Sequence, residues 1–186
     1  MHETVSQETR ETARAKIRVP TAAQMRDLGV RLAGQLRPGD LVVLTGPLGA
    51  GKTTLVQGLG EGLGVRGPVT SPTFVIARVH PSLHGGPALV HADAYRLGSR
   101  AEVDDLDLDA DLDRSVTVVE WGEGLAEGLA ASFLQITISR APLADQLPLP
   151  DATDEPRAVS IVGWGDRWEA AAASALLALT GAQEVL

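Results

Sequence analysis

The sequence predicts an α/β protein: a single domain with a central mixed, mostly parallel sheet flanked by helices. The chain has 186 residues, of which 44% are hydrophobic, and this suits one domain with a substantial core. Short apolar runs typical of buried strands alternate with stretches of helical periodicity. A glycine-rich segment also joins the first such run directly to a helix, as phosphate-binding α/β proteins require.

The N-terminal part of the chain predicts a tail, a helix and a strand. Residues 1–18 are polar, with charges of both signs, and are predicted to be a flexible tail, so that the domain covers residues 19–186. A helix is expected from Thr21, a suitable N-cap, to the break at Pro38. Its apolar positions recur at three- and four-residue steps: Met25, Leu28, Leu32 and Leu36. Residues 41–44 then form a strand buried on both faces, and a second helix is expected to about Leu63.

The rest of the chain predicts strands at 73–79, 88–92, 116–120, 133–139 and 158–162. The loop between the first two of these strands is too short for a parallel crossover, so they are expected to form an antiparallel hairpin. Residues 141–156 form a proline-rich loop, and residues 166–179 are expected to form a helix. The acidic stretch 102–113 is either a solvated surface or a docking face for a basic partner.

The segment from Gly46 to Thr53 matches G-x-x-x-x-G-K-[ST], the phosphate loop of P-loop NTPases. Glycines let the backbone fold around phosphates, and the next helix directs its positive N-terminus at the same anion. Lys52, one of only two lysines, would contact the β- and γ-phosphates, and Thr53 would ligate Mg²⁺. The predicted nucleotide-binding residues of this segment are Gly46, Leu48, Gly49, Ala50, Gly51, Lys52, Thr53 and Thr54.

Two carboxylates are expected beside this loop. Asp93 follows the apolar run 88–92 and Glu120 follows the run 116–119, and ligands gather at the carboxyl ends of strands in open α/β sheets. Each could alone be a loop carboxylate, but the two together beside a phosphate loop favour a catalytic role. His91 is either an active-site acid or base or a hydrogen-bonded core residue.

Composition excludes several classes of protein. The chain has no cysteine, so disulfides and thiolate metal sites are excluded. No apolar run approaches the length of a membrane span, and the N-terminus has no signal-peptide pattern; a cytoplasmic protein is expected. The net charge of −8 argues against tight nucleic-acid binding by the protein's own surface.

Three further motifs accompany the phosphate loop: Ser71-Pro72-Thr73-Phe74, His91-Ala92-Asp93-Ala94-Tyr95-Arg96-Leu97 and Glu120-Trp121. Together with the loop, they make the sequence resemble the bacterial TsaE (YjeE) family of ATPases. The resemblance runs from about Thr21 to Arg140, and more weakly through the last strand.

The resemblance implies an ATPase required for threonylcarbamoyladenosine at position 37 of tRNA. It implies ATP and Mg²⁺ as ligands and the TsaD–TsaB transferase as partner, with tRNA contacted only through that complex. ATP binding would dock the protein and hydrolysis would reset the complex. By the same resemblance, the catalytic residues are Lys52, Asp93 and Glu120. The residues that would lie beside the metal ion are Thr53 and Glu120. Trp121 would lie close to the nucleotide.

The resemblance also makes residues 71–74 a switch-like loop near the γ-phosphate. Neither it nor the residues decide which of Asp93 and Glu120 orients the attacking water. Many members carry Asp where this chain has Pro47, and Thr near the adenine where this chain has Met25, so the adenine contacts stay unassigned. The alternative functions are a small-molecule or nucleotide kinase that uses the same loop, or a protein in which ATP is a structural ligand.

Overall fold

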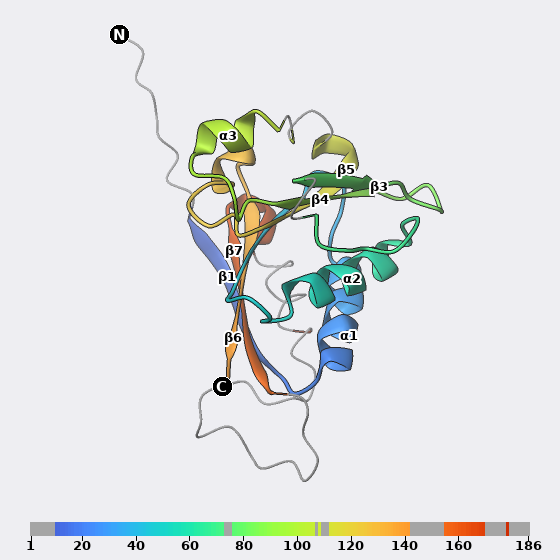
Figure 1. Ribbon diagram of the computed structural model, residues 1–186, viewed down its shortest axis with the longest axis vertical. Helices are drawn as coiled ribbons and strands as arrows, with labels where there is room; N and C mark the ends of the chain where they lie inside the picture. Colours follow the sequence, from blue (N-terminus) through green and yellow to red (C-terminus); the bar gives the residue numbers. More distant parts are fainter. Residues whose placement is uncertain are drawn as a thin grey trace.

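A computed structural model describes residues 10–72, 76–106, 108, 112–141, 155–169 and 178. Within these residues a seven-stranded sheet has the order β1-β7-β6-β2-β5-β4-β3 (Figure 1). The strands are β1 (Glu11–Val19), β2 (Leu41–Thr45), β3 (Ala77–His80), β4 (Ala88–Asp93), β5 (Ser115–Glu120), β6 (Phe133–Arg140) and β7 (Arg157–Trp164). The α-helices are α1 (Ala22–Ala33), α2 (Lys52–Leu63) and α3 (Arg100–Asp104). The short 3₁₀ turns are η1 (Leu112–Arg114), η2 (Glu127–Leu129) and η4 (Asp166–Trp168).

The sheet is mixed, as predicted, and its centre is parallel. Strand β2 pairs in parallel with β5 and β6, and β5 pairs in parallel with β4. Antiparallel strands extend both edges, with β7 and β1 beyond β6 and with β3 beyond β4. The predicted β3–β4 hairpin is confirmed, although β3 begins only at Ala77 and residues 73–75 lie outside the described part of the chain.

Helices α1 and α2 pack side by side on one face of the sheet (Figure 1). The side chain of Thr21 accepts a hydrogen bond from the Gln24 N–H, which confirms the predicted N-cap. The two helices approach closely where Gly29 faces Gly58. A Cβ atom on Gly58 would collide with the Arg26 carbonyl oxygen, so only glycine fits this contact.

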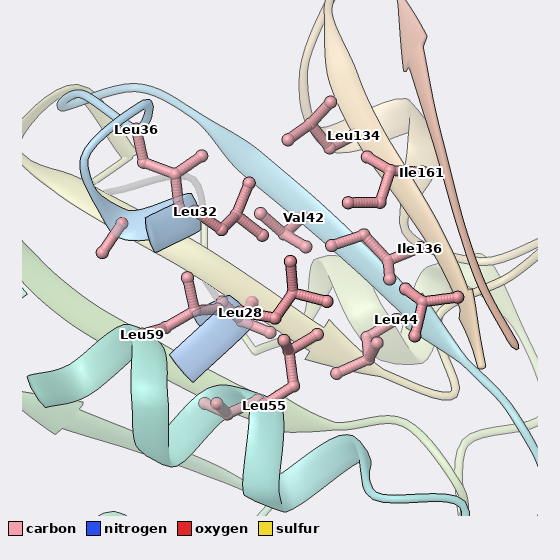
Figure 2. Close-up of a cluster of buried hydrophobic side chains, with 14 of the residues drawn as sticks. Leu28, Leu32, Leu36, Val42, Leu44, Leu55, Leu59, Leu134, Ile136 and Ile161 are labelled. Carbon is pink, nitrogen blue, oxygen red and sulfur yellow. The ribbon is translucent and has the colours of Figure 1, made fainter. Parts of the chain in front are cut away.

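The larger core cluster lies between these helices and the sheet (Figure 2). It joins apolar side chains of both helices to those of strands β2, β6 and β7: Leu28, Leu32, Leu55, Leu59, Val42, Leu44, Leu134, Ile136 and Ile161. A second cluster covers the other face of the sheet, where Val103 of α3 and Ala126 pack with Leu41, Val43 and Val119. Strand β2 is therefore buried on both faces, as its continuous apolar sequence predicts.

The prediction of a tail over residues 1–18 is wrong for Glu11 onward. These residues form β1, which pairs antiparallel with β7 from Glu11 to Val19. Ala13, Ala15, Ile17 and Val19 are buried and alternate with more exposed residues, which is the period of a strand with one buried face. The charged residues on the outer face concealed this alternation. Residues 1–9 lie outside the described residues.

The C-terminal segment also differs from its prediction. The start of the helix expected over residues 166–179 is wrong, because Asp166–Trp168 form a 3₁₀ turn and Glu169 is extended, whereas residue 178 is helical. Residues 170–177 and 179–186 lie outside the described residues, as do residues 142–154 of the predicted proline-rich loop. Across the described residues, no helix has both the length and the apolar character that a membrane crossing demands.

If β1 is an integral strand, truncating its core side chain destabilises the whole domain. Ile17 is 1% exposed, so we expect Ile17→Ala to lower the free energy of unfolding by about 2–5 kcal/mol in chemical denaturation. Lys16→Ala, on the exposed face of the same strand, is the control and should change it by less than about 0.5 kcal/mol. Equal, small effects of both substitutions would show that β1 adds nothing to stability.

Candidate active site

The carboxyl ends of three parallel strands bring the predicted site residues together. Strand β2 leads into the phosphate loop, and β4 and β5 end at Asp93 and Glu120. In the pairing register Leu44 lies opposite Glu120, and Glu120 lies opposite Asp93. The sheet therefore places both carboxylates beside the phosphate loop, as their positions after apolar runs predicted.

The phosphate loop has a conformation that depends on its glycines. Gly46, Gly49 and Gly51 have φ angles of 154°, 74° and 104°, a region that other residues rarely adopt. A Cβ atom on Gly46 would also collide with the Ile138 carbonyl oxygen of the neighbouring strand. Helix α2 begins directly at Lys52, so its N-terminus and the partial positive charge there face the loop.

Lys52 is buried and held against its own loop. Its Nζ donates hydrogen bonds to the carbonyl oxygens of Gly46 (2.8 Å) and Pro47 (3.0 Å). The same ammonium lies 3.9 Å from the ring centroid of Trp121, a cation–π contact. Burial lowers the pKa of Lys52 below its ordinary value, and the charges of Glu120 and Asp93 partly offset this.

Trp121 owes this position to an unusual backbone. Its φ angle is 59°, a left-handed conformation that is rare for a bulky residue. The Trp121 N–H donates to the Leu44 carbonyl oxygen at 2.8 Å, which fixes the turn that follows β5. Tyr95 packs against the Trp121 ring with 5.2 Å between centroids, so two aromatic rings lie beside Lys52.

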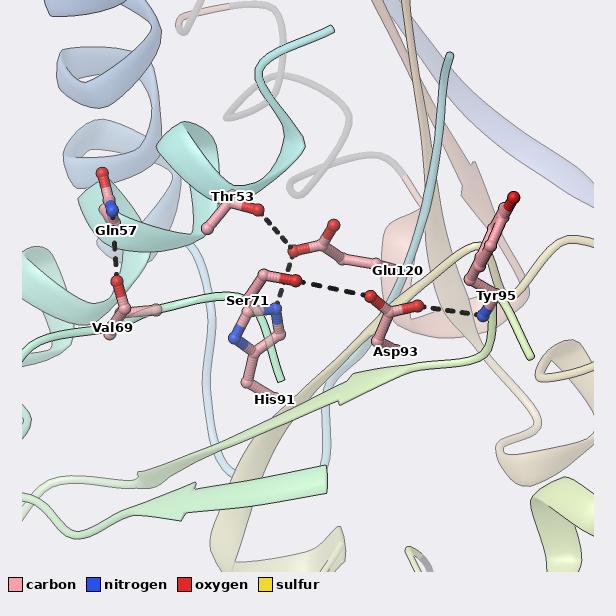
Figure 3. Close-up of polar contacts among 8 residues, drawn as sticks. All are labelled: Thr53, Gln57, Val69, Ser71, His91, Asp93, Tyr95 and Glu120. Atoms are coloured by element: carbon pink, nitrogen blue, oxygen red, sulfur yellow. Dashed lines mark hydrogen bonds and ion pairs between the residues drawn. The ribbon is translucent and has the colours of Figure 1, made fainter. Parts of the chain in front are cut away.

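Glu120 is the most enclosed acid of the site, and Figure 3 shows it between Thr53 and His91. It is 2% exposed, and its Oε1 accepts a hydrogen bond from the Thr53 hydroxyl at 3.1 Å. His91 Nε2 lies 2.8 Å from the same oxygen. Of the two interpretations of His91, the hydrogen-bonded core residue fits its position, since it is fully buried, but its partner belongs to the site.

Asp93 is held from the other side of the site. Its Oδ1 accepts a hydrogen bond from the Tyr95 N–H at 2.9 Å, and its Oδ2 lies 3.4 Å from the Ser71 hydroxyl (Figure 3). The chain before Ser71 is anchored to α2, because Gln57 Nε2 donates to the Val69 carbonyl oxygen. The first residue of the predicted switch-like loop thus contacts a predicted catalytic carboxylate.

A pocket of about 450 Å³ lies over these groups. It is lined by residues of the phosphate loop, of the Ser71 segment and of the ends of β4 and β5: Leu48, Gly49, Ala50, Gly51, Lys52, Thr53, Thr54, Ser71, Asp93, Tyr95, Glu120 and Trp121. Gly46 lies beneath it and accepts the Lys52 hydrogen bond. Of the remaining predicted loop residues, Pro72 is buried, whereas Thr73 and Phe74 lie outside the described residues.

A second hollow of about 430 Å³ adjoins the first on the far side of the phosphate loop. Gly49, Ala50, Gly51 and Thr54 line both hollows, and Thr21 and Met25 of the α1 region line the second. Glu155 and Arg157, joined by an ion pair of 3.1 Å, also line it. Sequence reasoning missed this pair, because no motif marks it and only the docking of β7 beside β6 brings it here.

The donor set of the first pocket suits Mg²⁺ bound together with a polyphosphate. Thr53 and Glu120 offer neighbouring hydroxyl and carboxylate oxygens, the ligand types that this ion prefers. The described residues contain no group of three or more His, Asp or Glu side chains that could enclose a metal by themselves. Mg²⁺ is usually held by one or two protein oxygens together with phosphates.

Comparisons with known proteins point to one family. The family model described as threonylcarbamoyl adenosine biosynthesis protein TsaE matches residues 19–147. A TsaE protein of Streptomyces coelicolor is 61% identical over 153 residues, which cover 82% of this chain and 99% of the relative. A TsaE protein of Bacillus subtilis is 38% identical over 72% of this chain and 75% of the relative. Both relatives are named tRNA threonylcarbamoyladenosine biosynthesis proteins.

A solved structure agrees with the fold. The crystal structure of Bacillus subtilis YdiB superposes with a TM-score of 0.63 at 29% sequence identity. The superposition covers 88% of this chain and 92% of that chain. The likeness therefore extends beyond the residues matched by the family model.

Proposed function

Because the chain belongs to the TsaE family of tRNA threonylcarbamoyladenosine biosynthesis proteins, we propose that it is the Mg²⁺-dependent ATPase of that pathway. The observation that carries the proposal is the convergence of Lys52, Thr53, Asp93 and Glu120 on one pocket beside a phosphate loop. A phosphate loop followed by a helix N-terminus favours a bound polyphosphate, and carboxylates at the strand ends supply what hydrolysis needs in addition.

Phosphate binding would use groups that line the pocket. The Lys52 ammonium would exchange its two carbonyl acceptors for oxygens of the β- and γ-phosphates. Thr53 and Glu120 would hold Mg²⁺, and this ion would neutralise negative charge on those phosphates. The second hollow, continuous with the first along the phosphate loop, would take the nucleoside, with Met25 and Arg157 in its wall.

The two carboxylates would have different tasks. Glu120 accepts a hydrogen bond from the Thr53 hydroxyl, so it would bind the metal ion together with Thr53. Asp93 is next to Ser71 of the switch-like loop and would orient the attacking water. The water oxygen attacks the γ-phosphorus, the bond to the oxygen that bridges the β- and γ-phosphates breaks, and ADP leaves. The proton of the water passes to Asp93 and then to the released phosphate.

The protein would act on tRNA through its partner. Its net charge of −8 disfavours direct binding of its surface to the phosphate backbone of tRNA. We propose that the ATP-bound form docks on the TsaD–TsaB transferase and that hydrolysis releases it. Leu48 and Tyr95 support a docking surface at the mouth of the pocket, because these large side chains are 94% and 64% exposed there.

Removal of the Lys52 ammonium is the test of the nucleotide site. Hydrogen bonds to charged groups contribute about 1.5–3 kcal/mol, so Lys52→Ala should weaken ATP binding about 10- to 100-fold in calorimetry. The control is Lys16→Ala, which removes the only other lysine, from the exposed face of β1. In a strain depleted of the protein, Lys16→Ala should restore threonylcarbamoyladenosine in tRNA and Lys52→Ala should not. Full restoration by Lys52→Ala would refute the proposed function.

Substitution of the two carboxylates separates their tasks. Asp93→Asn should lower kcat about 100-fold or more, as expected for the loss of a group that accepts a proton, while ATP affinity in the presence of Mg²⁺ stays near the wild-type value. Glu120→Gln should raise the Mg²⁺ concentration needed for half-maximal ATP binding. Single-turnover hydrolysis and calorimetry measure the two effects. The assignment is reversed if Asp93→Asn shifts the Mg²⁺ requirement and Glu120→Gln leaves it unchanged.

The docking surface is tested by truncating exposed side chains at the pocket mouth and, as a control, one away from it. The double substitution Leu48→Ala and Tyr95→Ala should weaken ATP-dependent binding to TsaD–TsaB by about tenfold or more, since exposed aromatic and aliphatic anchors carry much of an interface's energy. Val79→Ala is the control, because Val79 is 57% exposed on β3 and does not line the pocket. ATP affinity is measured in every variant, and only docking lost beyond any loss of ATP binding counts. Equal docking with and without ATP in the wild type would refute the switch.

A further inference from the structure

His91 is a buried histidine whose known contact is with the site carboxylate. Its side chain is fully buried, and its Nε2 lies 2.8 Å from Glu120 Oε1 (Figure 3). Its other ring nitrogen, Nδ1, is buried and has no hydrogen-bond partner among the described residues. Burying this unpaired nitrogen costs free energy, because it loses its hydrogen bonds to water and gains none in the protein.

The pairing of the strands explains how His91 reaches Glu120. His91 lies two residues before Asp93 on β4, so both side chains point to the same face of the sheet. Asp93 is paired with Glu120 on β5, and His91 therefore lies diagonally behind Glu120, toward the core. It does not line the pocket, whereas Glu120 does. Among the described residues, Glu120 is the hydrogen-bond partner of His91 and lies between it and the pocket.

The chemistry of the contact fixes the direction of the hydrogen bond. An ionised carboxylate only accepts hydrogen bonds, so the His91 hydrogen lies on Nε2 and is donated to Glu120 Oε1. Oε1 is held from two sides, by His91 from the core and by the Thr53 hydroxyl from the pocket.

We propose that His91 is a positioning residue, whose Nε2–H holds the Glu120 carboxylate in the orientation that faces Thr53 and a divalent cation. A free glutamate side chain has several rotamers, and ordering it at the moment of binding would cost free energy. Groups that hydrogen-bond to metal ligands typically change metal affinity or activity about 10- to 100-fold when removed. This inference rests on the proposed function, because it assigns Glu120 to the metal side.

The test compares metal binding with nucleotide binding in the full-length protein. Mn²⁺ replaces Mg²⁺ so that bound and free ion can be counted by electron paramagnetic resonance in the presence of ATP. His91→Phe keeps a planar ring and removes the donor, and His91→Gln restores an N–H. His80→Phe is the matched control, since His80 is also buried (4% exposed) and does not line the pocket.

We expect His91→Phe to weaken Mn²⁺ binding about 10- to 100-fold, while ATP affinity in EDTA stays within about twofold of wild type. His91→Gln should recover most of the Mn²⁺ affinity, and His80→Phe should retain all of it. A purely structural role is the outcome in which His91→Phe lowers the free energy of unfolding and leaves Mn²⁺ affinity unchanged, and this would overturn the inference.

A second pair of variants and the Glu120→Gln variant separate a folding defect from the loss of the metal site. If His91→Phe does not fold, His91→Gln is compared with His91→Asn, whose shorter side chain cannot reach Glu120; equal Mn²⁺ affinities of these two would refute the role. If the wild-type protein binds no Mn²⁺ with ATP, or if Glu120→Gln binds it normally, the assignment of Glu120 to the metal ion is itself refuted. The inference fails alone when Glu120→Gln loses Mn²⁺ and His91→Phe does not.

Discussion

The parallel pairing of β2, β5 and β4 is the constraint on which the candidate site depends. It places Leu44, Glu120 and Asp93 in one row across the sheet. Main-chain hydrogen bonds continue this row into the loops, from Trp121 N–H to Leu44 and from Ala94 N–H to Glu120. A slip of one residue in either strand would turn its carboxylate to the opposite face. The register therefore fixes the face of the sheet on which each acid lies.

A second constraint is the close approach of backbone to backbone around the phosphate loop. Gly58 lets α2 lie against α1 at Arg26, and Gly46 lets the loop lie against Ile138 of β6. The first contact brings Met25 of α1 next to Gly51, so the two helices share a wall of the second hollow. At these two contacts the backbones meet without an intervening side chain.

The sequence predicts best what is contiguous in the chain. The strand, loop and helix around Lys52 follow one another directly, and Asp93 and Glu120 are recognisable as the ends of apolar runs. Contacts that need the register of the sheet could not be predicted. The approach of His91 to Glu120 requires β4 to pair with β5, and the place of Arg157 requires β7 to lie beside β6. Strand β1 was missed because its exposed charged residues hide the alternation of small apolar ones.

The polar groups of the site have partners within the chain, and this shapes what binding can achieve. Lys52 donates hydrogen bonds to two carbonyl oxygens, and Thr53 donates one to Glu120. Asp93 accepts hydrogen bonds from the Ser71 hydroxyl and the Tyr95 N–H. A nucleotide would exchange these hydrogen bonds for others, and an exchange contributes less net free energy than a new bond. The gain would come instead from the phosphate charge against the helix N-terminus and Lys52. Such electrostatic terms grow when water is excluded. A partner that covers the exposed Leu48 and Tyr95 would exclude water from the pocket mouth, so docking and nucleotide binding would strengthen each other through the same few residues.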